Sequence, residues 1–340
     1  MRSGTTARND AHPEDVGEAL VEILEERNFP VRTLHLLASE RSEGKRIQFR
    51  DRSVMVKRLD QFDFSQVQIG LFSAGGSVSA EFAPIAAAAG CVVVDNTSHF
   101  RYDDDIPLVV PEVNAEAIGE YPNKGIIANQ NCSTIQMVVA LKPIYDAFGI
   151  ERVNVCTYQA VSGAGRSAVE ELVRQTTALL NGRPLELTGD AKQIAFNAIP
   201  HIDTFLDNRY TKEEMKMVWE TRKILGNDAI QVNPTAVRVP VFFGHSEAVH
   251  IETRDKMTAA ECRDLLAEAP GAERAVRALR ALLHAREPAR LATGGRLRAA
   301  ADLSDRRHRR RQHRVPGPPR RPARPGRTAS PSSGKSSRSS

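Results

Sequence analysis

The segment Asn129-Gln130-Asn131-Cys132-Ser133-Thr134 carries the strongest chemical signal in the sequence. The apolar run 125–128 before it is typical of a buried strand, and residues 135–141 after it are typical of a helix. Cys132 is therefore expected at a strand-to-helix turn, where backbone N–H groups and the helix dipole favour a thiolate. Because a thiolate attacks carbonyl carbon, this position predicts a nucleophile. The alternative is a buried and inert thiol, which the polar neighbours disfavour.

The other cysteines indicate a reducing compartment. Cys91, Cys156 and Cys262 lie far apart without a Cys-x-x-Cys pair, so neither a disulfide framework nor a metal site is expected. No stretch of 18 apolar residues is present, and the polar residues 1–15 do not resemble a signal peptide. These features predict a cytoplasmic protein that neither spans nor binds a membrane.

Helix and strand patterns alternate through the first half of the chain. This alternation predicts a parallel, doubly wound sheet, in which ligands bind at the carboxyl ends of the strands. The expected helices span 16–27 and 79–90, and the expected strands span 33–38, 54–56, 69–74, 91–96 and 125–128.

A dinucleotide-binding sheet ordinarily opens with a strand and a glycine-rich turn. Only Gly17 stands where such a turn would enter the first helix, and residues 8–15 contain neither an apolar strand nor a second glycine. The sheet is therefore expected to be incomplete, with its first strand missing.

The second half predicts a different architecture. Residues 153–161 alternate like a strand of a more open sheet, and Ser162-Gly163-Ala164-Gly165 follows as a tight loop. A helix over 167–180 and strands over 236–243 and 247–251 complete a mixed or antiparallel sheet. The expected organisation is an aberrant N-terminal segment (1–15), a nucleotide-binding domain (16–130), a catalytic and dimerisation domain (131–271) and a basic tail (272–340).

The tail differs in composition from the rest of the chain. Residues 272–340 contain 18 Arg and one Lys against four acidic residues, whereas the whole chain has a net charge of +5. The tail lacks aromatic residues, and it is rich in Ala, Arg, Pro and Gly, which have GC-rich codons. We interpret it as a disordered product of a shifted reading frame. A natural basic tail is the alternative.

Several motifs in the same order resemble bacterial aspartate-semialdehyde dehydrogenases, over about residues 16–271. They are Ser39 to Lys45, Asp95 to Ser98 with Arg101, Val110 to Asn114, Asn129 to Thr134, Gln159 with Ser162 to Gly165, Glu220 to Lys223, and Arg238 with Gly244 to Glu247. The resemblance implies a Rossmann-type domain joined to an α+β domain like that of glyceraldehyde-3-phosphate dehydrogenase. It also implies a cytoplasmic homodimer that acts in lysine, threonine, methionine and diaminopimelate biosynthesis.

The resemblance implies NADPH-dependent reduction of aspartyl phosphate to aspartate semialdehyde and phosphate. Cys132 would form the thioester, His245 would act as acid and base, and Gln159 would orient the substrate. Arg238 would hold the α-carboxylate and Glu220 the α-amino group. The phosphate would bind to Lys223, Arg101 and Asn131.

The cofactor that the resemblance implies is NADP. An acidic residue after the second strand favours NAD and an arginine favours NADP, and the sequence has both Glu40 and Arg41 there. The family pattern favours NADP, with Ser39, Arg41 and Ser42 around the 2′-phosphate. The rest of the cofactor site is expected to comprise Gly17, Ser73, Gly75, Gly76, Asn96, Ser162 and Gly163.

Three departures from the family predict weak NADP binding and aggregation. The first strand and its turn are missing, Gln130 replaces a proline, and the tail replaces the family's C-terminal part.

One alternative to an aspartate-semialdehyde dehydrogenase is an N-acetyl-γ-glutamyl-phosphate reductase, which shares the Cys/His chemistry. Another is an inactive remnant. A third is non-specific nucleic-acid binding through 306–311, without aromatic residues for base stacking.

Overall fold

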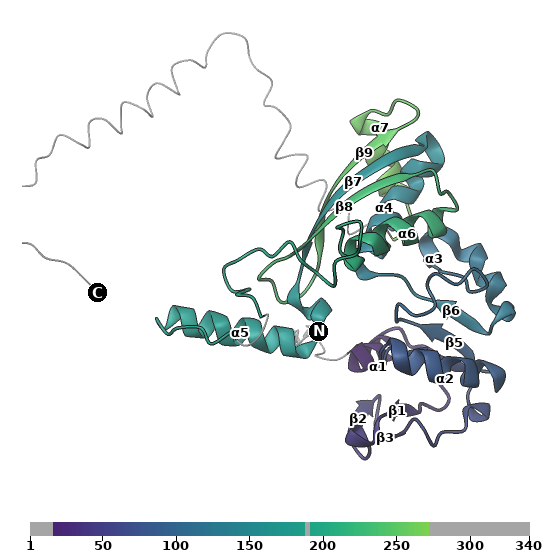
Figure 1. Cartoon of the computed structure of the whole chain (residues 1–340). Helices are drawn as coiled ribbons and strands as arrows, with labels where there is room; N and C mark the ends of the chain where they lie inside the picture. The colour runs from purple at the N-terminus through teal and green to yellow at the C-terminus, as the bar shows by residue number, and fades with distance from the viewer. Residues whose placement is uncertain (1–15, 188–190, 272–340) are drawn as a thin grey trace, which may run out of the picture. The chain divides into compact units, whose positions relative to one another are not determined.

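A computed structural model describes residues 16–187 and 191–271, in which nine strands form three sheets of three strands each (Figure 1). The segments 1–15 and 272–340, with the expected aberrant N-terminus and basic tail, lie outside the described residues.

The first sheet has the order β1-β3-β2. Helix α1 (Val16–Glu26) precedes β1 (Leu36–Ala38), and β1 pairs in parallel with β3 (Arg52–Arg58). Strand β2 (Arg46–Phe49) forms an antiparallel hairpin with β3, and sequence analysis did not predict it.

The second sheet is fully parallel, with the order β4-β5-β6. Its strands are β4 (Ile69–Phe72), β5 (Val92–Asp95) and β6 (Ile126–Ala128), and α2 (Gly76–Ala88) connects the first two. Val93 and Ala128 are fully buried, as expected for a parallel sheet whose two faces are covered. A short helix, α3 (Pro111–Asn114), precedes β6.

These two sheets together form the predicted Rossmann-type domain. A doubly wound sheet of this class runs 3-2-1-4-5-6, with the first strand at the centre. Among the described residues β1 pairs only with β3, and β4 pairs only with β5. The sheet is thus divided at the position that the first strand would occupy.

The third sheet has β7 (Ile150–Gln159) at its centre. β8 (Gln231–Arg238) pairs with β7 in parallel, and β9 (Ser246–Thr253) pairs with it antiparallel, which gives the expected mixed sheet. The carboxyl ends of β7 and β8 therefore lie beside the beginning of β9, at one end of the sheet. The helices of this half are α4 (Cys132–Phe148), α5 (Arg166–Leu180), α6 (Lys212–Leu225) and α7 (Ala259–Glu268).

Helix α6 has sequence signals at both ends. Thr211 and Glu214 form a capping box, in which the Thr211 hydroxyl accepts from the Glu214 N–H and the Glu214 carboxylate accepts from the Thr211 N–H. Gly226 ends the helix in the left-handed conformation (φ 61°). These caps fix where α6 begins and ends, and therefore which side chains it presents to the sheet.

No helix within 16–187 and 191–271 is long and apolar enough to cross a membrane. In the same residues no group of three or more His, Cys, Asp or Glu side chains could hold a metal ion.

A carboxylate is buried between β9 and α4. The Oε1 atom of Glu247 is inaccessible to water and has no hydrogen-bond partner among the described residues. Burial raises the pKa of Glu247 to about 7, although a hydrogen bond with Gln136 opposes the shift. A carboxyl with a raised pKa stays protonated in the folded protein while it ionises in the unfolded chain.

We expect this carboxyl to make stability fall with pH. Between pH 4.5 and about 7 the unfolded chain loses the Glu247 proton and the folded protein keeps it, so the free energy of unfolding should decrease by about 2–3 kcal/mol. Glu247→Gln should remove this slope and leave the variant less pH-dependent. Urea unfolding of both proteins at pH 5, 6, 7 and 8 measures the free energy of unfolding at each pH. The same decrease with pH in the wild-type chain and in Glu247→Gln would contradict the prediction.

Candidate active site

The turn that carries Cys132 connects β6 to α4. Asn131 caps α4, and its side-chain oxygen accepts from the N–H groups of Ser133 (2.9 Å) and Thr134 (3.4 Å). Cys132 is the first residue of the helix and is exposed. The strand-to-helix position expected for the nucleophile is therefore present, and the cap of the same helix is the neighbouring asparagine.

Three of the expected site residues lie together at one end of the third sheet, where β7 and β8 end and β9 begins. Gln159 is paired with Arg238 in the β7–β8 register, and His245 immediately precedes β9. Arg238 donates to the Ala160 carbonyl (2.7 Å), and the Ala160 N–H donates to Nδ1 of His245 (3.1 Å). The backbone N–H and C=O of a single residue, Ala160, thus hold both side chains.

Gly163 lies directly against these two side chains. A Cβ atom there would lie 3.2 Å from Arg238 Nη1 and 3.3 Å from His245 Nε2. Both distances are shorter than ordinary van der Waals contact, so a larger residue would displace the guanidinium or the imidazole. The expected role of Gly163 in close approach is consistent with this geometry, although the approach here is to protein side chains.

Glu213 on α6 joins the nucleophile turn to the sheet edge. Its Oε1 accepts from Asn131 Nδ2 (3.0 Å) and from Gln159 Nε2 (3.2 Å), and its Oε2 accepts from Lys216 (2.9 Å). Gln159 also donates to the Ser133 hydroxyl (2.7 Å). Although burial opposes it, the Lys216 charge and these donors hold the pKa of Glu213 below its usual value. A buried carboxylate therefore lies among the predicted catalytic residues.

Sequence analysis missed Glu213 and Lys216. It selected Glu220 and Lys223, which have the same spacing of three and lie seven residues further along the same helix. Two turns of a helix separate the pairs, so both lie on one face of α6. The capping box at Thr211 was the available signal, because it shows that α6 begins early enough to present Glu213.

Glu220 is placed behind the nucleophile turn. It is fully buried, and its oxygens accept from Arg101 (2.9 Å), the Asn131 N–H (2.6 Å) and the Tyr102 hydroxyl (3.3 Å). Burial raises the pKa of Glu220, and the Arg101 charge opposes the shift. With both oxygens engaged, this carboxylate is not available to a substrate amino group in the structure, which corrects the expected role.

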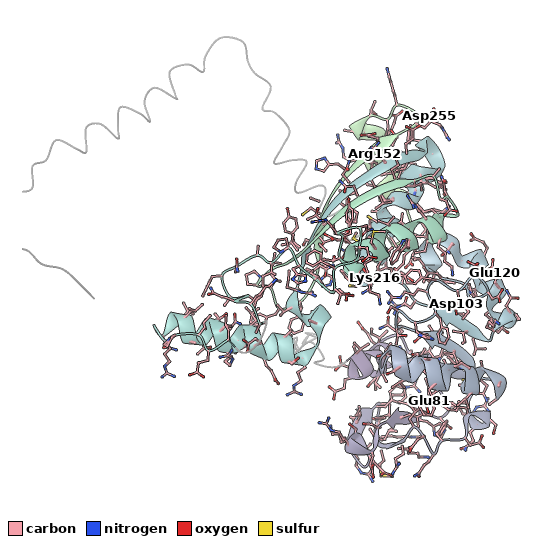
Figure 2. All side chains as sticks on the ribbon, viewed as in Figure 1. Glu81, Asp103, Glu120, Arg152, Lys216 and Asp255 are labelled. Carbon is pink, nitrogen blue, oxygen red and sulfur yellow. The ribbon has the colours of Figure 1, made fainter. Side chains whose placement is uncertain are left out.

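Arg101 and Lys223 are also occupied by the protein. Arg101 is buried, and besides Glu220 it donates to the carbonyls of Asn96 and Thr97 (3.0 Å each). Lys223 donates to the carbonyls of Arg101 (3.0 Å), Asp103 (2.6 Å) and Ile106 (2.9 Å), which uses all three ammonium protons. Figure 2 labels Asp103 on this loop. The structure thus assigns Lys223 to holding the loop and corrects its expected phosphate role.

The charge state of Cys132 differs from the expectation. Loss of hydration and the Glu213 charge together raise the pKa of the Cys132 thiol, although the Ser133 N–H and the Arg238 charge oppose them. The helix terminus alone predicted the opposite direction. In the free protein the residue is accordingly a thiol, and Glu213 is the charged group that most disfavours the thiolate.

His245 is held neutral. Burial and the Arg238 charge lower its pKa, and the Glu213 charge opposes them. Because the Ala160 N–H can only donate, Nδ1 of the neutral ring is the acceptor and the proton is on Nε2. His245 therefore presents an N–H donor beside Gly163.

The expected cofactor residues follow the carboxyl ends of their strands. Ser39 caps the turn Glu40–Ser42 after β1, Gly75 (φ 108°) and Gly76 begin α2 after β4, and Ser73 lies between β4 and that helix. Asn96 follows β5 and accepts from Asn129 (2.6 Å). Ser162 lies with Gly163 in the turn after β7, and Gly17 is the second residue of α1. A Cβ at Gly75 would meet nothing within 4 Å, which leaves its backbone accessible to a ligand.

Gln130, which replaces the family's proline, is 3% exposed. Neither its Oε1 nor its Nε2 has a partner among the described residues. A buried amide without partners costs about 1–3 kcal/mol.

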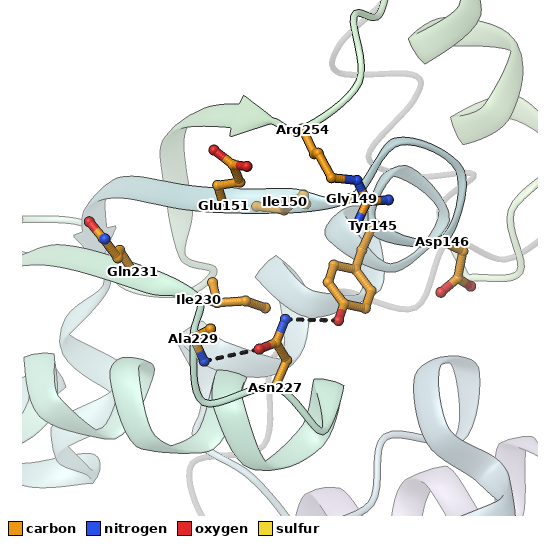
Figure 3. A pocket seen from close by; sticks show the side chains of 10 residues that line it. All are labelled: Tyr145, Asp146, Gly149, Ile150, Glu151, Asn227, Ala229, Ile230, Gln231 and Arg254. Atoms are coloured by element: carbon orange, nitrogen blue, oxygen red, sulfur yellow. Dashed lines mark hydrogen bonds between the residues drawn. The ribbon is translucent and has the colours of Figure 1, made fainter.

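A surface cavity of about 540 Å³ lies away from this site (Figure 3). Its wall includes Gly149 to Glu151 and Ala229 to Gln231, at the beginnings of β7 and β8, with Arg254 after β9. The predicted catalytic residues lie at the opposite ends of these strands. This cavity is therefore separate from the candidate active site.

Comparison with known families identifies two domains. The family model described as "Semialdehyde dehydrogenase, NAD binding domain" matches residues 15–121, and "Semialdehyde dehydrogenase, dimerisation domain" matches residues 141–299.

Curated relatives match about three quarters of the chain. Aspartate-semialdehyde dehydrogenase 2 of Vibrio cholerae is 64% identical over 258 residues, which are 76% of this chain and 77% of the relative. Aspartate-semialdehyde dehydrogenase of Bacillus subtilis is 53% identical over 264 residues, 75% of this chain and 76% of the relative.

Solved structures match about the same share of this chain. Aspartate semialdehyde dehydrogenase II of Vibrio cholerae has 64% identity and a TM-score of 0.74, covering 75% of this chain and 76% of that one, and the same values hold for its complex with ASA. A probable aspartate-semialdehyde dehydrogenase of Pseudomonas aeruginosa has 35% identity and a TM-score of 0.72, with the same coverage.

The Glu213 charge should control the reactivity of Cys132. Glu213→Gln removes a cause that raises the thiol pKa, so the pH profile of alkylation by iodoacetamide should move to lower pH and the rate at pH 7 should rise several-fold. Glu170→Gln, on exposed α5, is the matched control. An unchanged or higher midpoint in Glu213→Gln would show that the carboxylate does not act on the thiol.

Proposed function

The chain belongs to the aspartate-semialdehyde dehydrogenase family, and on that premise we propose that it catalyses NADPH-dependent reduction of L-aspartyl 4-phosphate to L-aspartate 4-semialdehyde and phosphate. The observation that carries the proposal is that Asn131, the residue before Cys132, and Gln159 both donate to Glu213, beside the end of the third sheet that holds His245 and Arg238. These groups supply a nucleophile, a proton donor and charges of both signs at one place.

Cys132 is the proposed nucleophile. Its sulfur attacks the acyl carbon, the carbon–oxygen bond to phosphate breaks, and phosphate leaves with the electron pair and takes up the thiol proton, which gives a thioester. NADPH, when bound, would supply the hydride that reduces this thioester, and with a proton on the oxygen the product is a thiohemiacetal. The carbon–sulfur bond then breaks, the aldehyde leaves, and the hydroxyl proton of the thiohemiacetal passes to the sulfur. The Arg238 charge opposes the rise in the pKa of the Cys132 thiol, which favours the first step.

His245 is the proposed group at the reacting oxygen. The Ala160 N–H fixes the proton on Nε2, so the neutral ring can donate a hydrogen bond to an oxygen that gains negative charge. The low pKa of His245 keeps the ring neutral until such an oxygen forms. Its expected action as acid and base remains part of the proposal.

Arg238 and Glu213 are the proposed contacts of the amino-acid head group. The guanidinium can bind an α-carboxylate through two parallel hydrogen bonds, and the Glu213 carboxylate carries the charge that an α-ammonium requires. The two charges interact with each other and with Cys132 in the free protein. An N-acetylated amine has no positive charge for Glu213 to bind. The pair therefore favours free aspartyl phosphate over an N-acetyl-γ-glutamyl phosphate.

Lys216 is the proposed phosphate ligand in place of Lys223. It is labelled in Figure 2 on α6, and it pairs with Glu213 (2.9 Å) and with Asp203 (3.0 Å). Although burial opposes it, Glu213 raises the pKa of Lys216 and keeps the ammonium charged. Lys216 is held by two salt bridges that can be exchanged for a phosphate, whereas Lys223 is held by three backbone carbonyls.

The described residues fit NADP at both ends of its expected site. Ser39, Arg41 and Ser42 form the turn after β1 where a 2′-phosphate would lie, and Gly75 presents an open backbone at the beginning of α2. Ser162 and Gly163 would border the nicotinamide. For the pyrophosphate between these ends, the described residues provide only Gly17 of the expected glycine-rich turn. We therefore propose that the chain binds NADP weakly.

We propose a homodimer on the basis of the match to a dimerisation domain. The third sheet has one face toward α4 and α6, and its other face carries the exposed Tyr158. A cytoplasmic location accords with substrates that are small phosphorylated metabolites.

The proposed activity requires Cys132. Purified chain should reduce NADP in the presence of aspartate semialdehyde and phosphate, and Cys132→Ala should lose at least about 10³-fold in rate because no thioester can form. Cys262→Ala on α7 is the matched control and should retain the wild-type rate. NADP reduction that persists in Cys132→Ala, or that does not require phosphate, would contradict the mechanism.

Lys216 and Lys223 should behave differently. Lys216→Met should raise the KM for phosphate about tenfold or more, because it removes a cation that a ligand can reach, and it should also lower the melting temperature, because the buried Glu213 charge loses its partner. Lys223→Met should lower the melting temperature and leave the KM for phosphate unchanged, because the three carbonyls that it removes a donor from belong to the protein. Steady-state kinetics and thermal unfolding of both variants test this. A raised KM for phosphate in Lys223→Met but not in Lys216→Met would instead support Lys223 as the phosphate ligand.

A further inference from the structure

The turn after β1 carries side chains of opposite charge that favour different cofactors. Ser39, Arg41 and Ser42 are the residues expected around a 2′-phosphate, and Glu40 stands among them with a side chain that is 77% exposed. An acidic residue at this place ordinarily accepts hydrogen bonds from the ribose hydroxyls of NAD, and its charge repels the additional phosphate of NADP. The carboxylate therefore opposes NADP binding unless another group neutralises it.

Strand β3 places a cation beside this carboxylate. Arg58 is the last residue of β3, and it is in parallel register with Ala38, the last residue of β1 (Figure 1). Because the two strands are parallel, their carboxyl ends lie at the same edge, where the turn begins. Nη1 of Arg58 lies 3.3 Å from Oε1 of Glu40. The two side chains thus form an ion pair at the entrance of the turn.

Asp60 anchors Arg58 from the other side. Nε of Arg58 donates to Oδ1 of Asp60 (3.1 Å) and Nη2 donates to Oδ2 (2.7 Å), which is a bidentate pair that fixes the plane of the guanidinium. These hydrogen bonds with Asp60 raise the pKa of Arg58, and the charges of Glu40 and Glu43 add to the rise. The Arg58 side chain is 25% exposed, against 77% for Glu40, so the arginine is the more firmly held partner.

Backbone hydrogen bonds hold the turn against the same strand. The Gly44 N–H donates to the Val56 carbonyl (3.0 Å), and the Val56 N–H donates to the Lys45 carbonyl (2.8 Å). Within the turn, the Ser42 N–H donates to the Ser39 carbonyl (2.9 Å). The carboxylate and the guanidinium are therefore brought together by the fold of the free protein, without the contribution of a bound cofactor.

We propose that Arg58 sets the preference of this chain for NADP over NAD, because it neutralises Glu40 and so allows a 2′-phosphate to approach Arg41. Arg58 is a positioning residue, since it acts through the glutamate and its fork is already shared between two carboxylates. Arg41 is exposed and has no salt bridge among the residues that the structure describes, so it remains the direct phosphate ligand. This inference rests on the proposed function in that it takes NADP as the cofactor.

The test compares two adenosine nucleotides that differ only in the 2′-phosphate. Adenosine 2′,5′-bisphosphate carries this group and adenosine 5′-monophosphate lacks it, and neither contains the pyrophosphate or the nicotinamide of the cofactor. Isothermal titration of the full chain at low ionic strength, where charges are least screened, measures both affinities. We expect the wild-type chain to bind the bisphosphate at least about tenfold more tightly than the monophosphate.

Removing the cation should expose the glutamate charge. Arg58→Met should weaken binding of the bisphosphate about three- to tenfold and leave the monophosphate within about twofold, because only the 2′-phosphate is repelled. Unchanged monophosphate binding also shows that the variant is folded. Arg46→Met on β2 is the matched control: it removes the same charge from an exposed arginine of the same hairpin, whose side chain donates to the Ser53 carbonyl, and it should bind both nucleotides normally.

The double variant separates neutralisation from direct contact. Glu40→Gln combined with Arg58→Met should bind the bisphosphate within about twofold of the wild-type chain, because the charge that needs neutralising is gone. If Arg58 instead touched the 2′-phosphate, the loss in Arg58→Met would persist in the double variant. Rescue by the second substitution is therefore a result that a purely structural role of Arg58 would not give.

Four outcomes would overturn the proposal. They are a wild-type chain that binds the two nucleotides equally or binds neither, an unchanged bisphosphate affinity in Arg58→Met, an equal loss in Arg46→Met, and a loss that Glu40→Gln does not rescue. The readout is binding and needs no turnover. A chain without Cys132-dependent activity would contradict the proposed reaction and leave these nucleotide affinities as expected, so the two failures are distinguishable.

Discussion

Two buried carboxylates on one face of α6 hold the turn that carries Cys132. Glu220 accepts the backbone N–H of Asn131, and Glu213 accepts its side-chain amide. Because Asn131 also caps α4, the position of the first residue of α4 depends on both contacts. Each carboxylate is balanced by a cation, Arg101 for Glu220 and Lys216 for Glu213. Removing one partner of such a pair leaves an uncompensated buried charge, which typically costs about 3–5 kcal/mol. The geometry of the nucleophile is therefore set by a second helix, distant in sequence.

The two carboxylates differ in what remains available to a ligand. Glu220 is enclosed by the arginine, a tyrosine and the backbone, so its function is to position the turn. Glu213 shares its contacts with Gln159 and Lys216, and its charge reaches Cys132 and Arg238. A substrate ammonium that binds Glu213 would cancel the charge that disfavours the thiolate. Binding of the correct head group would then lower the pKa of Cys132, which couples recognition to activation.

The divided sheet of the nucleotide-binding half and the intact third sheet affect different parts of the site. The mixed sheet of β7, β8 and β9 is continuous and brings Gln159, Arg238 and His245 to one edge. The nucleotide-binding half is joined instead by a packed row of rings, those of His35, Phe62, Phe64 and Phe72, while two strand edges stay unpaired among the described residues. Packing of aromatic side chains can hold two sheets near each other, but only strand pairing satisfies their peptide groups. Catalytic geometry and cofactor binding can thus fail independently in this chain.

The sequence by itself determined the elements and the family. Alternating patterns located β4, β5, β6, α4 and β7, because a buried strand and an amphipathic helix each impose a period on the residues. Sequence reasoning could not choose between Glu213 and Glu220, since the spacing of three recurs after two helical turns and both pairs suit a surface ion pair. It also predicted a thiolate from the helix terminus alone. Only the tertiary structure decided these points, because which turn of α6 faces Cys132, and which charges surround the thiol, depend on contacts between residues more than 80 positions apart.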